Sequence, residues 1–563
     1  MVYLKRCFLL DTYKKTKKKI IVKGYNMKAK NFSTLVSVIT ILGMTFFSVN
    51  AYAKASTSAA VVKTTTTTTT TTEATTETTT SAPLDENGVP LTGDKLSIYN
   101  IVNNTPKNNM AVVYTPDWKE TVDENNDYIL SQREVTFENG DYFYMHKYQF
   151  KKNNPENLKK SLTIPGKDIE IRYVNPEDNQ WYMSKNIENT AYTVMYVDTD
   201  CYSIAIGVPA VYLSNTSNNS LERVLEQEKP VTITQVTGGY VLNYEFPQNT
   251  QVIGEIWVLR SKNKLANWNN KGDFDALKHD LGHERRFAWD GYYFPTPSTY
   301  VPYNENMLYR HPSNYVGSAY VKNANIPLAK ELGYILTKIC MENQNTQGYW
   351  ATGPKSGWLV ADFGIGGGFY DTRFNTDFAE NLLNAYKEYN NEDFLRSVVT
   401  YANYYIKHAQ NNNYVTQNGG ILVEDYGYSE QHIKTHVSLN HQLAEMNFLY
   451  ELYEVTREQS YLDLADKMLL AVEDTRDQWV LPSGNLNYAL YYTGVTNTMV
   501  DYPYLTYNDL YITKNVLKKY HNRTSATIEY LMANKLEWMK ANNVTGYYGQ
   551  TQDTDYDTTE IAG

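Results

Sequence analysis

Cysteine is scarce in this chain, and its scarcity excludes a fold held together by disulfides. Only three occur in 563 residues, and the first of them, Cys7, lies in a segment that we expect to be absent from the mature protein. The remaining Cys201 and Cys340 make no disulfide framework, and neither CxxC nor HExxH spacing is present to indicate zinc. We therefore expect no metal site. The length leaves room for two or three domains, each with its own hydrophobic core.

The chain also lacks a strong charge of either sign. Its 52 basic and 62 acidic residues give a net charge of −10, which argues against a nucleic-acid partner or an anionic membrane surface. Long hydrophobic runs are missing as well. The apolar stretch at 35–49 is interrupted by Ser and Thr and is shorter than the ~20 residues of a membrane span. We expect no stable span in the mature chain, and the oligomeric state stays open.

The amino-terminal region has the features of an export signal. Residues 1–26 resemble an upstream extension, and 27–53 contain two lysines, the apolar stretch and the small-x-small sequence Ala51-Tyr52-Ala53. Residues 54–94 form a threonine-rich linker with nothing to bury, as expected of an extended tether. The sequence therefore predicts a secreted or cell-surface protein.

Tyrosine is the residue present in excess. The chain has 51 tyrosines, whose flat rings can stack on sugars while their hydroxyls form hydrogen bonds. The alternative is that tyrosine is abundant because it favours β-strands. Residues 95–265 show short alternating runs separated by turn residues such as Gly238-Gly239, which predicts a β-sandwich-like domain.

Residues 123–134 have the ligand order of an EF-hand calcium loop. However, Tyr128 stands where the sharp turn of that loop requires glycine, and no helices evidently flank the segment. The favoured interpretation is a polar hairpin turn.

The sequence period changes after a connector at 266–320. A helical motif recurs at Asn381, Asn447 and Asn515, each time followed by a short turn and a second amphipathic helix, at 393–408, 461–473 and 524–539. Helix pairs repeated at a fixed period indicate a solenoidal or closed α/α array. We therefore predict an α/α-toroid domain of helical hairpins over 321–545, followed by a tail at 546–563. The fold class is multidomain, β followed by α.

Three loops between these helices concentrate polar and aromatic residues. The glycine-rich loop at 364–373 lacks the Gly-Lys-Ser/Thr of a phosphate loop, and its Arg373 could bind a substrate carboxylate bidentately. The loop at 419–441 contains Glu424 and Asp425, which could take part in acid/base chemistry with a partner carboxylate from elsewhere. The loop at 484–510 is rich in tyrosines. These could act as acids or bases if a neighbouring group lowered the pKa, and otherwise would be platform or core residues.

The helical half resembles the carboxy-terminal domain of the D-glucuronyl C5-epimerase family. Phe369-Tyr370 and the helix after it are similar to the aromatic-Tyr segment of that family, and Glu424-Asp425-Tyr426 to its acidic-acidic-tyrosine motif. Ser438-Leu439-Asn440 is similar to its Leu-Asn-Gly motif, and Tyr488 and Asp501-Tyr502 fall where the family carries two catalytic tyrosines. The likeness runs in the same order over about 364–510.

This resemblance implies an α/α toroid of the six-hairpin glycosidase-like type and an isomerase that needs no organic cofactor. C5 epimerisation removes the proton α to the uronate carboxylate and returns one on the opposite face. The implied catalytic pair is Tyr488 and Tyr502. The implied substrate-binding residues are Arg373, Tyr370, Glu424, Tyr426, Asn440, His441, Tyr507 and Asn508.

The chain departs from the family at several positions. Ala444 stands where a functional tyrosine is expected, His441 replaces the glycine of the Leu-Asn-Gly motif, and Pro503 replaces part of a histidine-rich run. Thr376-Asp377 replaces an expected Gly-Gln pair.

Three functions therefore stay open. The first is an epimerase, or a lyase of related chemistry, on a uronate-containing polysaccharide. The second is a glycoside hydrolase that pairs Glu424 or Asp425 with Asp501, Asp509 or Asp377, and the third is a non-catalytic glycan-binding protein of the cell surface.

Overall fold

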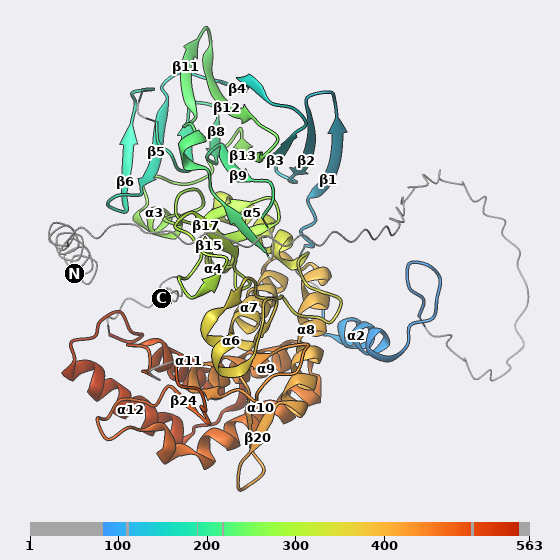
Figure 1. Cartoon of the computed structure of the whole chain (residues 1–563), viewed down its shortest axis with the longest axis vertical. Helices are drawn as coiled ribbons and strands as arrows, with labels where there is room; N and C mark the ends of the chain where they lie inside the picture. The colour runs from blue at the N-terminus through green and yellow to red at the C-terminus, as the bar shows by residue number, and fades with distance from the viewer. Residues whose placement is uncertain (1–82, 108–111, 189, 217–218, 497–499, 551–563) are drawn as a thin grey trace, which may run out of the picture. The chain divides into compact units, whose positions relative to one another are not determined.

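The computed structural model describes residues 83–107, 112–188, 190–216, 219–496 and 500–550 (Figure 1). The predicted signal peptide and most of the threonine-rich linker lie outside these residues. Within the described part, strands dominate first and helices second. No described helix combines the length and the apolar character that crossing a membrane requires.

A nine-stranded antiparallel sheet forms the centre of the β-rich domain. Its strand order is β1-β2-β3-β13-β8-β7-β5-β6, and β9 pairs with β13 beside this path. The strands are β1 (Asp117–Glu124), β2 (Tyr128–Thr136), β3 (Tyr142–Phe150), β5 (Glu170–Asn175), β6 (Gln180–Ser184), β7 (Met195–Asp198), β8 (Ser203–Ile206), β9 (Ala210–Leu213) and β13 (Val252–Ser261). The segment that imitates a calcium loop is the β1–β2 hairpin, in which Asp123 lies opposite Leu130. The polar hairpin prediction is confirmed.

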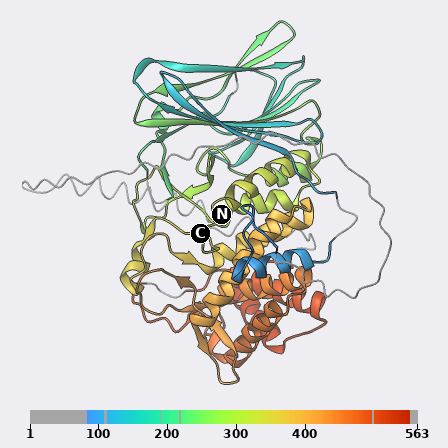
Figure 2. The same cartoon turned by 90° about the vertical axis from the view of Figure 1, so that its right-hand side faces the viewer.

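A second sheet packs on the first and completes the sandwich (Figure 2). It contains β4 (Asn154–Pro165), β11 (Thr232–Val236) and β12 (Gly239–Gln248). The Gly238-Gly239 break is the turn between β11 and β12. Gly238 has a φ of +82°, and a Cβ at Gly239 would lie 2.2 Å from the Ile164 carbonyl oxygen. The two glycines thus permit a tight turn against β4.

Both faces of the sheet are buried at its central strand, β13. On β13, Ile256 and Val258 face the second sheet, whereas Trp257 and Leu259 belong to the same hydrophobic core as the helices. This alternation follows from the two-residue period of a strand. The β-rich domain is therefore a sandwich whose outer face supports the helical domain.

The connector is structured, unlike a simple linker. It supplies β14 (Arg286–Ala288), β15 (Gly291–Pro295) and β17 (Met307–Arg310) to a sheet that also takes in β10 (Ser220–Glu222). Arg286 forms two hydrogen bonds, of 3.1 and 3.0 Å, to the buried Glu228 carboxylate. The helix α3 (Lys271–Ala276) lies in the chain directly before β14.

The helical domain consists of consecutive hairpins stacked in chain order (Figure 2). Contacts run along one layer of helices from α4 to α7, α9 and α11, and α5, α8, α10 and α12 form the other layer. The bounds are α4 (Tyr315–Lys322), α5 (Pro327–Met341), α7 (Thr372–Tyr389), α8 (Glu392–Asn411), α9 (Leu439–Thr456), α10 (Gln459–Asp474), α11 (Leu505–His521) and α12 (Ala526–Ala541). The three predicted pairs are confirmed. The pair α4–α5 comes in addition, so the described residues contain four hairpins, fewer than the six of the expected toroid type.

Two boundaries differ from those predicted. The helix α2 (Gly93–Asn104) occupies the expected junction of linker and β domain, and it packs against α8. The helical array begins at Tyr315 instead of 321. Both segments were missed because α2 has no marked apolar face and α4 spans only eight residues.

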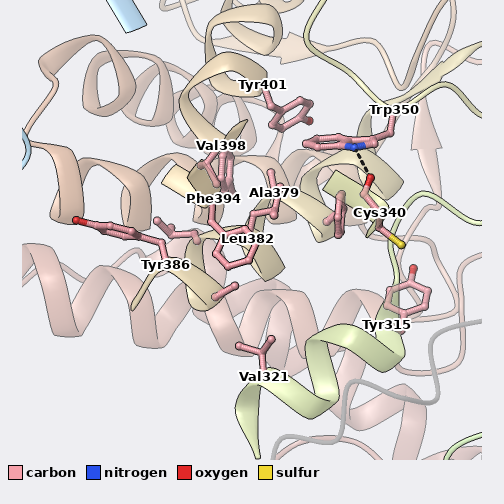
Figure 3. Packing of buried hydrophobic residues seen from close by; sticks show 14 of the residues in the cluster. Tyr315, Val321, Cys340, Trp350, Ala379, Leu382, Tyr386, Phe394, Val398 and Tyr401 are labelled. Atoms are coloured by element: carbon pink, nitrogen blue, oxygen red, sulfur yellow. Dashed lines mark hydrogen bonds between the residues drawn. The ribbon is translucent and has the colours of Figure 1, made fainter. Parts of the chain in front are cut away.

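The space between the two helix layers is filled by aromatic and aliphatic side chains (Figure 3). Trp350 donates a hydrogen bond of 3.0 Å from Nε1 to the Cys340 carbonyl, and its ring packs edge-on against Phe378. Cys340 is buried and Cys201 is exposed, and both are free thiols. The smaller elements are β16 (Tyr300–Val301), β18 (Lys355–Ser356), α6 (Gly357–Phe363), β20 (Asn413–Val415), β21 (Ile421–Val423) and two 3₁₀ turns (Leu225–Gln227 and Arg476–Trp479).

Candidate active site

Short strands join the amino-terminal ends of the inner helices. β19 (Tyr370–Asp371) leads into α7 and pairs with β22 (Tyr426–Gly427), so that Asp371 lies opposite Tyr426. β23 (Val437–Ser438) leads into α9 and pairs with β24 (Ala489–Leu490). A hydrogen bond of 3.0 Å from the Asp425 amide to the His436 carbonyl connects the two ladders. Segments far apart in sequence are thereby aligned in one layer.

This layer brings together three tyrosines, Tyr426, Tyr488 and Tyr502, which we call the tyrosine cluster. The ring centroids of Tyr488 and Tyr502 lie 5.9 Å apart with the rings at 68°. Tyr502 is 39% exposed, whereas Tyr488 is 8% and Tyr426 7% exposed. The predicted catalytic pair is therefore brought together, with one member accessible to solvent. However, the rings contact each other, so a sugar ring does not fit between them.

The hydroxyls of the tyrosine cluster are held in the protonated form. Burial raises the pKa of Tyr488 well above 10, and the nearby charges of Tyr502, Asp425 and Asp371 raise it further. Burial also raises the pKa of Tyr502, although the charge of Arg373 opposes the shift. At neutral pH these phenols can donate hydrogen bonds or protons, but neither is a general base by itself.

Asp371 is a titratable group whose charge acts on all three tyrosines of this cluster, and our sequence reasoning passed over it. It is 5% exposed and caps α7, where its Oδ1 accepts a hydrogen bond of 2.9 Å from the Phe374 amide. Burial raises the pKa of Asp371 to about 7, helped by the charges of Asp425 and Asp377 and opposed by the amides of Phe374 and Arg373. A carboxyl group that titrates near neutrality is suited to general acid/base chemistry. The available signal was an Asp directly before a helix, following the Phe369-Tyr370 motif.

Asp425 has a supporting position beneath the cluster. Its carboxylate has no exposed surface, and it accepts hydrogen bonds of 2.8 and 2.6 Å from the amide and hydroxyl of Ser438. Burial would raise the pKa of Asp425, but His441, His436 and Ser438 outweigh burial and lower it. His436 Nε2 lies 3.2 Å from this carboxylate, and the imidazole ring packs against Tyr426 and Tyr488. Asp425 therefore positions its neighbours and does not contact solvent.

The Arg373 guanidinium is hydrogen-bonded to other residues of the protein. It donates to Asp509 through two nitrogens, at 2.8 and 3.1 Å, and to Asp377 at 2.8 Å. A further bond of 3.0 Å goes to the Asn440 carbonyl. With its charge balanced by two carboxylates and its surface 7% exposed, Arg373 joins α7, α9 and α11. A substrate carboxylate would have to compete with these partners.

The other predicted binding residues are buried around the site. Tyr370 shares a hydrogen bond of 3.0 Å with the Tyr401 hydroxyl, and Glu424 accepts one of 2.7 Å from the Thr435 amide. His441 Nδ1 lies 2.9 Å from the Thr372 hydroxyl, and burial lowers the pKa of His441 to about 4.

Three further predicted residues lie at the starts of α9 and α11. Asn440 has a buried Oδ1 without a hydrogen-bond partner among the described residues. Tyr507 packs against Tyr547, and Asn508 accepts a bond of 3.0 Å from the Tyr548 amide.

The carboxylates that the sequence analysis named as possible partners of Glu424 or Asp425 in a hydrolase are also bonded to other side chains of the protein. Asp377 and Asp509 bind Arg373, and Asp501 forms a fully buried salt bridge with Lys535 and accepts a bond of 2.6 Å from Thr506. Across the described ranges, no three His, Cys, Asp or Glu side chains converge in a way that would hold a metal ion. The cavity of about 550 Å³ in this protein is not lined by the tyrosine cluster.

The comparisons with known proteins leave the family open. No family model matches the chain, and no curated protein matches it either. Among solved structures, D-mannose isomerase is 14% identical with a TM-score of 0.31, covering 42% of this chain and 63% of its own. This chain thus spans less than two thirds of that isomerase.

Two other solved structures give similar values. A family 76 glycoside hydrolase from a bovine strain of Bacteroides thetaiotaomicron is 13% identical with a TM-score of 0.34, covering 75% of this chain and 78% of its own. Cellobiose 2-epimerase from Bacillus thermoamylovorans is 13% identical with a TM-score of 0.28, covering 36% and 51%. Likenesses this remote carry no information on activity, so function has to be argued from the site.

Proposed function

We propose that this protein is a carbohydrate-active enzyme that removes the C5 proton of a uronate residue in a polysaccharide. The observation that carries the proposal is the position of Asp371. A carboxyl group with a pKa of about 7 faces protonated phenols where the inner helices begin. This combination supplies a base and proton donors in one place.

The Asp371 carboxylate and the two phenols would act at different points of the reaction. The Asp371 carboxylate would accept the C5 proton, leaving an enolate-like charge on the uronate carboxylate. The hydroxyls of Tyr488 and Tyr502 would donate to that charge, and the amino-terminal ends of the inner helices would stabilise it further. Donation of the Tyr502 phenol proton to C5 on the opposite face gives an epimer, after which Tyr502 takes up a proton from solvent and Asp371 releases the abstracted one. Expulsion of the C4 substituent gives an unsaturated product.

The remaining carboxylates support this choice over a two-carboxylate hydrolase. Asp377, Asp501 and Asp509 are each paired with a buried cation, whereas the charge of Asp371 acts on all three phenols. Asp425 is fully buried. A hydrolase needs a pair of carboxyl groups, one on each side of the scissile bond and ~5–10 Å apart.

We also propose that the protein acts outside the cell membrane, because its substrate is a polysaccharide and its amino-terminal region has the features of an export signal. Sequencing of the mature protein from culture supernatant or cell wall would test this. A new amino terminus close to Ala53 is expected, and an intact, intracellular chain would contradict export.

The activity is tested by incubating the purified protein with uronate polysaccharides in D₂O. Loss of the H5 proton NMR signal without new ultraviolet absorbance would identify an epimerase. New absorbance of an unsaturated uronate would identify a lyase. Neither signal with any uronan would contradict proton abstraction.

In that case a non-catalytic glycan-binding protein becomes the favoured alternative. Ala444, at the position of an expected functional tyrosine, and the mutual contact of Tyr488 and Tyr502 favour it. Binding of a uronan without chemical change would then support it.

A further inference from the structure

We propose that the protein has a second carbohydrate site, specific for neutral sugars, in a cavity around Trp268. The cavity has a volume of about 550 Å³, within the ~300–1,000 Å³ typical of small-molecule sites. It is lined from the sheet by Arg172 and Asp198 and from the turn between α4 and α5 by Asn325 and Pro327. This site does not depend on the proposed C5 chemistry.

The cavity and the tyrosine cluster lie at opposite ends of the first inner helix. α4 begins at Tyr315, whose hydroxyl bonds Asp377 at 3.1 Å beside Arg373, and it ends at Lys322, just before the turn that lines the cavity. Eight helical residues rise ~12 Å. A ligand in the cavity is thus separated from the tyrosine cluster by the length of α4.

The floor of the cavity is aromatic and held in place. The Trp268 ring packs against Trp181, Tyr196 and Phe274, with centroids 5.5, 5.5 and 5.2 Å away. Trp268 itself is only partly buried, so its ring lines the cavity from a rigid support. The Arg172 guanidinium lies over the Trp268 ring, 4.9 Å from its centroid, so a sugar would stack its C–H face on the part of the indole that this guanidinium leaves exposed.

The walls of the cavity carry several polar side chains that can form hydrogen bonds with a ligand. The exposed amides of Asn267, Asn269 and Asn325 line the cavity together with the carboxylates of Glu170 and Asp273. Arg172 is 5% exposed, and its buried Nε has no hydrogen-bond partner among the described residues. Because this Nε has almost no exposed surface, a ligand in the cavity would bond to the exposed asparagine amides and not to the Nε.

The charged side chains that line the cavity favour a neutral ligand over a negatively charged one. Arg172 donates to Asp198 at 2.9 Å and also bonds Glu170, and Lys264 binds the Thr199 carbonyl at 2.8 Å. Three carboxylates therefore line the cavity against two cations, and both cations are already paired, Arg172 with Asp198 and Glu170 and Lys264 with Asp198 at 3.8 Å. A uronate would meet net negative charge, whereas sugar hydroxyls can donate to the carboxylates and accept from the amides.

The test is titration calorimetry of the full-length protein with neutral gluco-, manno-, galacto- and xylo-trisaccharides and with a uronate trisaccharide. We expect a neutral trisaccharide to bind with a dissociation constant on the order of 1 mM or tighter. The double substitution Asn269→Ala/Asn325→Ala should weaken binding about tenfold, because it removes two hydrogen-bonding amides from exposed positions. Trp268→Ala should abolish it.

Trp118→Ala is the matched control, because Trp118 is a partly buried tryptophan of β1 that does not line the cavity. Tyr488→Phe should leave trisaccharide binding unchanged. If Trp268→Ala fails to fold, the asparagine double variant decides. The proposal is overturned if no neutral trisaccharide binds, if only the uronate binds, or if binding survives the asparagine substitutions and is lost in Tyr488→Phe.

Discussion

Two groups of tyrosines lie close together in the helical domain and differ in what their hydroxyls face. In the first group, the Tyr401 hydroxyl lies 3.0 Å from that of Tyr370 and 2.7 Å from Thr376 Oγ1, and Tyr405 donates to Glu445 at 2.5 Å. These three side chains are no more than 1% exposed. Their hydroxyls are paired with one another or with neighbouring polar groups inside the core.

The tyrosine cluster is the second group, and the charge of Asp371 acts on all three of its hydroxyls. The Asp371 charge raises the pKa of Tyr426, Tyr488 and Tyr502 alike, and Tyr502 reaches the surface. Burial raises the pKa in both groups, so a raised pKa does not distinguish them. A carboxyl neighbour does not distinguish them either, because Glu445, whose burial raises its pKa, lies beside the first group. What distinguishes the tyrosine cluster is the solvent exposure of Tyr502.

The largest effect on activity is expected from Asp371→Asn, which removes the proposed base beside the second group. We expect deuterium incorporation at C5, or formation of the unsaturated product, to slow by about 10²–10⁴-fold. Asn caps helices about as well as Asp, so the thermal midpoint should change little. Asp477→Asn, at an exposed carboxylate, is the control. Unchanged activity in Asp371→Asn would remove the basis of the proposed mechanism.

The pH dependence follows from the same residue. If Asp371 acts as the base, kcat/KM of the wild type should rise with pH and level off above about 7. The effect of pH on stability has the opposite sign, because stability falls as the pH rises. The folded pKa is raised from 3.8 to about 7, so the stability that Asp371 contributes is fully present below pH 3.8 and lost as the pH rises past about 7. Asp371→Asn should flatten both profiles.

Arg373→Met tests whether the arginine beneath the second group is structural. It leaves Asp377 and Asp509 buried without their cation, which should lower the free energy of unfolding by about 3–5 kcal/mol. Chemical denaturation measures this change. Arg373→Met/Asp509→Asn should recover part of the loss, because one uncompensated charge is removed. A stable Arg373→Met variant with a raised KM alone would instead support the predicted carboxylate clamp.

The smallest effects are expected from two matched tyrosine substitutions. Tyr401→Phe removes a paired hydroxyl in the core and should lower the free energy of unfolding by about 1–3 kcal/mol, with kcat nearly unchanged. Tyr488→Phe removes a buried hydroxyl that bonds Ser438 and should lower the free energy of unfolding by about 0.5–1.5 kcal/mol, while slowing proton exchange at C5 by about 10–100-fold. If the two variants exchanged these behaviours, the distinction between the groups would be wrong.

Much of the architecture was predictable because it depends on local periodicity. The recurrence at Asn381, Asn447 and Asn515 identified three hairpins, and alternation identified the strands of the sandwich. α2 and α4 were missed, because a short helix or one without an apolar face leaves no clear period. The structured connector was missed because its strands are short and pair with β10, which is distant in sequence.

The sequence by itself determined the order of domains, the hairpin repeat and the loops that contain the candidate site, since all of these follow from composition and spacing. Only the tertiary structure decided which side chains in those loops meet. It placed Arg373 between two carboxylates and Asp371 beside the phenols. The physical reason is that burial and charge pairing depend on segments from three different helices. A residue's pKa, accessibility and free hydrogen-bonding capacity are therefore properties of the packed molecule.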